Sequence, residues 1–204
     1  MRDATVPDQP PSVLRRRYGL GARWFHWVTA LLVFTVIPLG WIFGAFKTKP
    51  GAPDTFVAPF PGTPADHASA HMTVGLVLFP IIALRVLYRF RHSPPRLPGT
   101  MGAFEKGLAH LMHWLLYAVL IAMPVSGYIM SSGDKAPIRF LGLIDFPKVP
   151  TTPGQGMTAA IVHVYAQFAV YTLVILNLAG TAWHLFVRRD NILGRMLPRQ
   201  SNHD

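Results

Sequence analysis

Residues 67–90 read HASAHMTVGLVLFPIIALRVLYRF, and this stretch decides the fold class. It carries no formal charge from His67 to Leu84. At about 1.5 Å per residue, the stretch is long enough to cross a hydrocarbon core of about 30 Å. It also carries histidine, which is costly within an apolar span unless it finds a partner. The stretch therefore predicts a membrane helix that bears a functional site.

Three further apolar runs, together with the composition, indicate that the whole chain lies in a membrane. The 204 residues are 51% hydrophobic and only 14% charged, with a mean hydropathy of +0.32, which is too apolar for an ordinary soluble domain. We predict an all-α, integral membrane four-helix bundle that forms a single domain over residues 1–204. The expected spans are about 24–46, 67–90, 107–131 and 157–187, and the expected flexible tails are 1–17 and 199–204.

The distribution of basic residues predicts the topology. Fourteen of the nineteen Lys and Arg residues lie on the N-terminal side of the expected bilayer. The five on the other side are Lys47, Lys49, Lys135, Arg139 and Lys148. By the positive-inside rule, both termini are expected to be cytoplasmic. The basic residues flank apolar runs instead of lining one face, which favours the lipid bilayer as a partner and excludes nucleic acid.

The two outer loops are expected to be rich in proline and irregular. The first outer loop lies between the first two spans, and the second lies between the last two. In the second loop, residues 138–146 are predicted to form a short interfacial helix.

Histidines supply the candidate ligands, because the chain has no cysteine for an iron–sulfur cluster, a thiolate-ligated haem or a c-type attachment. A six-coordinate haem needs imidazoles from different helices at matched depth. His71 and His163 both lie near the outer ends of their spans and form the first expected pair. Hydrogen bonding across helices is the alternative. Gly75, one turn from His71, either leaves room for a porphyrin or packs a helix, and His67 is expected to be solvated.

The inner side leaves more alternatives. His26 lies near the inner end of the first span and is a candidate ligand for a second haem. Asn177 lies roughly 21 Å below His163 along the fourth span, and an amide is a poor iron ligand. His184 lies roughly 31 Å below His163, at the edge of the hydrocarbon core. Arg85 is expected either to neutralise haem propionates or to snorkel to the interface.

Two histidines of the third span also face the inner side. His113 is a further candidate partner for His26. With His110, it is equally expected to belong to a quinone site or to form hydrogen bonds between helices.

Four motifs in order along the chain carry a family resemblance. They are Tyr18 with His26-Trp27, then His71-x-x-x-Gly75 with Arg85-x-x-x-Arg89, then His110-x-x-His113 with Tyr117 and Pro124-x-x-Gly127, and finally Arg189-Asp190-Asn191-x-Leu193-x-Arg195-Met196-Leu197-Pro198. With these motifs the chain resembles the prokaryotic cytochrome b561 family, which includes superoxide oxidases, and is similar to cytochrome b subunits of membrane hydrogenases. The resemblance covers about Tyr18 to Pro198.

The resemblance implies a bacterial inner-membrane protein with two bis-histidine b haems, one near each face. His71 and His163 match the outer ligands, and His26 matches one inner ligand. The other inner ligand falls on Asn177, where the chain departs from the pattern. One haem b is therefore expected at the outer pair. The inner haem is absent, is five-coordinate on His26, or uses His184 or a histidine of the third span.

Three functions follow from these observations. The first is electron transfer between haem and a quinone such as ubiquinone, with superoxide oxidised at the outer face. The second is a haem-bearing anchor or relay for a separate dehydrogenase or hydrogenase, which would be its redox partner. The third is a transporter that moves protons or metal through membrane histidines. A transporter would need carboxylates in the spans, and none of the four expected spans contains Asp or Glu.

Overall fold

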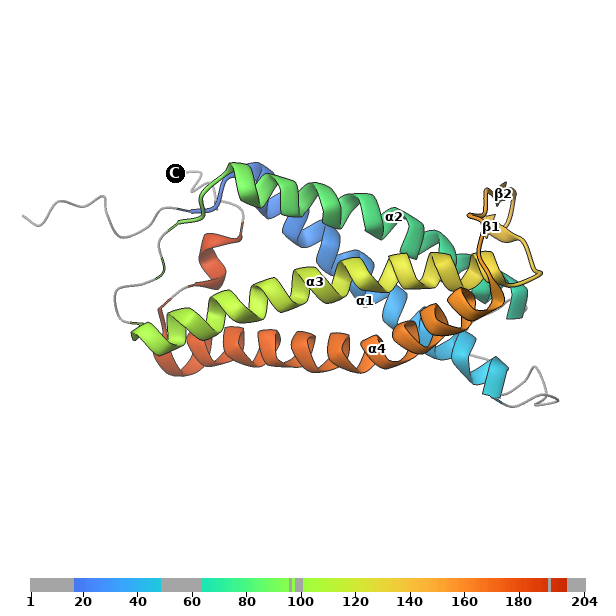
Figure 1. The fold of residues 1–204 in the computed structure, drawn as a ribbon. Helices are drawn as coiled ribbons and strands as arrows, with labels where there is room; N and C mark the ends of the chain where they lie inside the picture. The colour runs from blue at the N-terminus through green and yellow to red at the C-terminus, as the bar shows by residue number, and fades with distance from the viewer. Residues whose placement is uncertain (1–16, 49–63, 96, 98–100, 191, 198–204) are drawn as a thin grey trace, which may run out of the picture.

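The computed structural model describes residues 17–48, 64–95, 97, 101–190 and 192–197. Its four long helices are α1 (Leu20–Thr48), α2 (Pro64–Arg91), α3 (Ala103–Gly133) and α4 (Pro153–Ala182) (Figure 1). Each is long and apolar enough to cross a membrane, so the prediction of an all-α membrane bundle is confirmed. Apart from Arg17, the predicted tails 1–17 and 199–204 lie outside the described residues.

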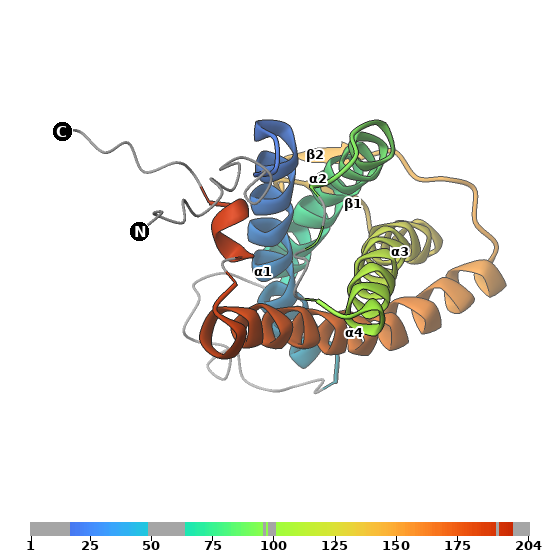
Figure 2. The same ribbon diagram turned by 90° about the vertical axis from the view of Figure 1, so that its left-hand side faces the viewer.

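The bundle consists of two helix pairs. Helix α1 packs along α2, α3 packs along α4, and contacts between α2 and α3 join the pairs (Figure 2). Helices α1 and α3 begin at the same end of the bundle, where α2 and α4 finish, and we call this the proximal end (Figure 1). The opposite end carries the two short strands β1 (Ile138–Phe140) and β2 (Ile144–Phe146), and we call it the hairpin end.

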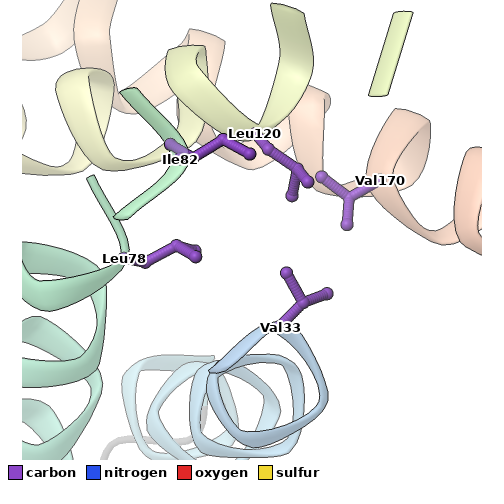
Figure 3. Close-up of a cluster of buried hydrophobic side chains, with 5 residues drawn as sticks. All are labelled: Val33, Leu78, Ile82, Leu120 and Val170. Atoms are coloured by element: carbon purple, nitrogen blue, oxygen red, sulfur yellow. The ribbon is translucent and has the colours of Figure 1, made fainter. Parts of the chain in front are cut away.

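A small apolar cluster joins all four helices near mid-length. Its buried members are Val33, Leu78, Ile82, Leu120 and Val170 (Figure 3). Many large apolar side chains on the outside stay exposed, among them Leu31 at 67% and Phe168 at 58%. Such exposure suits a protein whose outer surface meets lipid tails, because lipid and not protein then covers these side chains.

The second outer loop contains a β-hairpin. Strand β1 (Ile138–Phe140) pairs antiparallel with β2 (Ile144–Phe146), so the expected helix over 138–146 is wrong. Each strand alternates apolar, charged and apolar residues, a period of two that suits a strand. The charged residues face each other across the pair, with Arg139 Nε 3.6 Å from an Asp145 carboxylate oxygen. Positive φ angles at Leu141 and Gly142 make the tight reversal.

The hairpin is bound to the first turns of α2. The Ser69 hydroxyl donates to the carbonyl of Arg139 at 2.8 Å, and the amide of Leu141 donates to the Thr73 hydroxyl at 2.8 Å. His67 is only 6% exposed, so the expectation that it is solvated is wrong. Because α2 begins at Pro64, His67 is already helical and lies on the same face as His71, one turn away.

The C-terminal segment returns to the start of α1. Helix α4 continues into a π-helical turn, η2 (Trp183–Arg188), which is followed by a short 3₁₀ helix, η3 (Leu193–Arg195). Arg23 donates from Nη1 to the carbonyl of Leu197 at 2.8 Å, and the Trp27 indole donates to the carbonyl of Met196 at 2.9 Å. These bonds tie the two ends of the described chain together at the proximal end.

Candidate functional site

The imidazoles of His71 on α2 and His163 on α4 meet in the half of the bundle nearer the hairpin. Their ring centroids lie 6.2 Å apart and their planes are nearly perpendicular, at 86°. A histidine nitrogen lies about 2 Å from a metal it coordinates, so two imidazoles on opposite sides of one metal have centroids about 6 Å apart. The observed separation therefore fits an iron atom between the two rings.

Helix α1 positions His71. The Nδ1 atom of His71 lies 3.2 Å from the carbonyl oxygen of Val36. Gly40, one turn further along α1, sits directly against the ring, since a Cβ atom there would lie 3.0 Å from His71 Cε1. The glycine thus permits the imidazole to approach the α1 backbone.

Helix α3 positions His163 in the same way. The Nδ1 atom of His163 lies 2.9 Å from the carbonyl oxygen of Met123 and 3.2 Å from the Ser126 hydroxyl. A Cβ atom on Gly127 would lie 3.0 Å from His163 Cε1. Because a carbonyl only accepts, the proton is on Nδ1 and the lone pair is on Nε2 in both histidines, the tautomer of many metal-binding imidazoles.

The two histidine rings are held by the same arrangement on the neighbouring helix. We call this arrangement, a backbone carbonyl at Nδ1 and a glycine against the ring, a ring seat. In each, a carbonyl precedes a glycine by four residues, as Val36 precedes Gly40 and Met123 precedes Gly127, with a proline between them. A helical carbonyl already bonded within its helix has a second lone pair for the imidazole. Helix α1 therefore serves α2 as α3 serves α4, and the site is built by both helix pairs.

The side of α2 next to His71 is open at Gly75. A Cβ atom there would meet no described atom within 4 Å. The described neighbours therefore do not pack closely against this glycine. Space beside an imidazole on the same helix face is what a planar macrocycle requires, so the residues present fit a haem at this position.

A different polar group occupies the proximal end. Arg85 Nη2 lies 3.0 Å from His26 Nδ1, and the Arg85 guanidinium lies 5.4 Å from the centre of the Tyr117 ring. An arginine only donates, so His26 Nδ1 accepts and the proton of its neutral ring is on Nε2. This tautomer is the opposite of the one at His71 and His163.

The remaining candidate residues have separate contacts. His184 pairs through Nδ1 with Asp190 at 2.7 Å, and His110 and His113 contact carbonyls of their own helix. The backbone carbonyl of Asn177 accepts from Thr181. Among the ring and hydrogen-bond contacts of the described residues, His26 meets Arg85 and Trp27, and His113 of α3 lies close enough to act on it electrostatically.

Comparison with known proteins places the chain in a family. A model described as prokaryotic cytochrome b561 matches residues 17–199. The chain belongs to the prokaryotic cytochrome b561 family. Membership makes it a multi-pass bacterial membrane cytochrome of electron transport, and the family implies b-type haem.

Curated relatives match over nearly their whole length. The chain is 27% identical to cytochrome b561 homolog 2 of Escherichia coli K12, over 91% of this chain and 94% of that protein. It is 25% identical to cytochrome b561 homolog 1 of the same organism, over 90% and 98%. It is also 24% identical to the probable superoxide oxidase CybB of Yersinia pestis, over 92% and 99%.

Sequence reasoning missed the ring seats of this b561 cytochrome. Gly40 and the carbonyls of Val36 and Met123 were not singled out, whereas Gly127 entered only as part of a motif. The signal is present as a proline followed closely by a glycine, in Pro38-x-Gly40 and Pro124-x-x-Gly127. What the sequence does not contain is the register that brings each glycine to a histidine of the next helix.

Proposed function

We propose that this cytochrome holds one haem b between His71 and His163 and exchanges electrons with a quinone. The observation that carries the proposal is the 6.2 Å separation of the two rings, each with Nδ1 at a backbone carbonyl. A bound haem would supply one-electron redox chemistry. The carbonyl at each Nδ1 holds both imidazoles in the same tautomer, which would leave each Nε2 free to bind the iron. In this proposal the four helices act as a single cytochrome domain.

The contact between Arg85 and His26 favours one haem over two. A guanidinium against Nδ1 puts the proton of neutral His26 on Nε2, where an iron ligand needs a lone pair. Along α2, the cluster residues Leu78 and Ile82 lie between His71 and Arg85. A single haem near the hairpin end therefore accounts for the side chains better than the two-haem pattern that the resemblance implies.

We further propose that the hairpin end faces the outside of the bacterial inner membrane and that superoxide is oxidised there. The basic residues of the sequence favour this orientation by the positive-inside rule. Oxidation of two superoxide ions would yield two oxygen molecules, and the two electrons with two protons would convert ubiquinone to ubiquinol. The described basic residues of the second outer loop are Lys135, Arg139 and Lys148, whereas the side chains of Lys47 and Lys49 lie outside the described part.

Haem-dependent reduction of ubiquinone by enzymatically generated superoxide tests this activity. The purified, haem-loaded protein is expected to form ubiquinol in proportion to its haem content, and added superoxide dismutase should stop the reaction. A fully loaded preparation that forms no ubiquinol would remove superoxide as the donor. Reduction of the haem by a quinol in the same preparation would still support quinone exchange.

Gly75→Ala tests the position of the haem. In the described structure a methyl group at this position meets nothing within 4 Å, and alanine favours a helix by about 1 kcal/mol over glycine. If haem fills this space, haem content per chain should fall while the haem-free protein melts at the same or a higher temperature. Full haem content in Gly75→Ala would contradict a porphyrin beside this turn.

A further inference from the structure

A cavity of about 850 Å³ opens at the proximal end, away from the histidine pair. Three separate segments form its walls: the start of α1, the last turns of α2 with the chain beyond them, and η3 at the C-terminus. Tyr117 of α3 also lines it. The lining residues include Arg17, Tyr18, Arg85, Arg89, Tyr117 and Arg195.

The lining is strongly cationic. It contains four arginines and a histidine, and it includes neither an aspartate nor a glutamate. Arg85 and Arg89 lie one turn apart on α2, where like charges repel. Among the described residues, no carboxylate lies within ion-pair distance of either side chain. Arg85 instead contacts His26 and Tyr117, which are neutral partners.

The phenol of Tyr18 does not compensate this charge. Burial raises the pKa of Tyr18 above its usual value, although Arg89 and Arg195 act in the opposite direction. The phenol therefore keeps its proton at neutral pH and is a hydrogen-bond donor. The cavity thus presents guanidinium and hydroxyl donors together.

The cavity is assembled by specific contacts. The amide of Tyr18 donates to the carbonyl of Arg195 at 3.3 Å, which brings η3 to the start of α1. Tyr88 packs directly against the same segment, because a Cβ atom on Gly21 would lie only 2.8 Å from its ring. Tyr88 also stacks on His92, with ring centroids 3.9 Å apart. The walls are therefore held by residues distant in sequence.

We propose that this cavity binds a phosphate group, and specifically the headgroup of an anionic phospholipid. Arginine matches phosphate through paired N–H donors, and basic pockets between membrane helices at the cytoplasmic face suit anionic headgroups. The cavity lies at the ends of membrane spans, and its lining also includes apolar residues such as Phe25 and Met196, which suit a ligand with an acyl chain. This inference rests on the proposed orientation of the chain in the membrane, but not on the haem or on superoxide.

Native mass spectrometry of the full-length, haem-loaded protein tests the proposal. Delipidated protein is titrated with phosphatidylglycerol, with phosphatidylcholine and with inorganic phosphate. We expect one tightly bound phosphatidylglycerol per chain, with affinity above that for phosphatidylcholine. Arg89→Gln should weaken phosphatidylglycerol binding about tenfold, as expected for the loss of one charge-assisted contact. Arg89→Lys, which keeps the charge, should lose less.

Arg91→Gln is the matched control. Arg91 lies on the same helix and carries the same charge but does not line the cavity. The proposal would be overturned if Arg91→Gln weakened phosphatidylglycerol binding as much as Arg89→Gln does. It would also be overturned if the protein bound phosphatidylglycerol and phosphatidylcholine equally well and did not bind inorganic phosphate. Tight binding of inorganic phosphate without lipid preference would support the phosphate site and assign it to a soluble ligand. If Arg89→Gln loses haem and Arg91→Gln does not, the cavity belongs to haem propionates and the lipid proposal is overturned.

Discussion

Replacing either His71 or His163 with alanine is expected to remove the same haem and to abolish the b-type α band of the reduced protein. The two imidazoles face each other at 6.2 Å, so either substitution removes one of the two axial ligands. The measurement is the reduced-minus-oxidised spectrum with haem content per chain. Both variants should reach near-zero haem content, and ubiquinone reduction should be lost with it.

His110→Ala provides the matched control for this experiment. His110 is exposed, and its Nδ1 contacts the carbonyl of Lys106 in its own helix, so its replacement should leave haem content unchanged. His26→Ala separates the one-haem and two-haem proposals, because it should also retain the haem. Loss of haem from only one of the His71 and His163 variants would contradict the pairing. A second haem lost with His26 would contradict the single-haem proposal.

The membrane bundle could be predicted because its signal is local. Each apolar run is longer than a bilayer core is thick, and the rise of a helix gives the depth of every residue along it. Depth along the helices alone is enough to predict that His71 and His163 lie at the same level in the membrane. Depth also predicts that His184 lies at the opposite edge of the hydrocarbon core from His163.

The contacts between helices could not be predicted in this way. Helical rise gives depth, but which residues of neighbouring helices touch depends on how each helix is rotated and how the pair is aligned. The bond between Arg85 and His26 is such a case, since both residues were candidates but were assigned separate roles. The hairpin was not predicted either, because the prolines of this loop favour irregular structure. The alternation in Ile138-Arg139-Phe140 and Ile144-Asp145-Phe146 nevertheless favours strands.

Gly127→Ala is expected to have the next largest effect, because it acts on His163 without removing a ligand. The new Cβ atom would lie 3.0 Å from His163 Cε1, so the ring must shift by a few tenths of an ångström. Overpacking of this kind costs roughly 1–3 kcal/mol, which corresponds to about a 5-fold to 150-fold loss of haem affinity if the strain falls on the bound state. Haem titration of the haem-free protein measures this loss. Gly40→Ala should act similarly on His71.

Gly107→Ala tests whether such losses come from the ring seats or from the helix. Gly107 lies in the same helix as Gly127, but a Cβ atom there meets no described atom within 4 Å. Alanine at position 107 should therefore leave haem affinity unchanged and, through its higher helix propensity, stabilise the protein slightly. If Gly127→Ala and Gly107→Ala bind haem equally well, the glycine at the His163 ring has no part in positioning the ligand. A loss confined to Gly40→Ala and Gly127→Ala would mean that α1 and α3, which carry neither of these histidines, set the orientation of both.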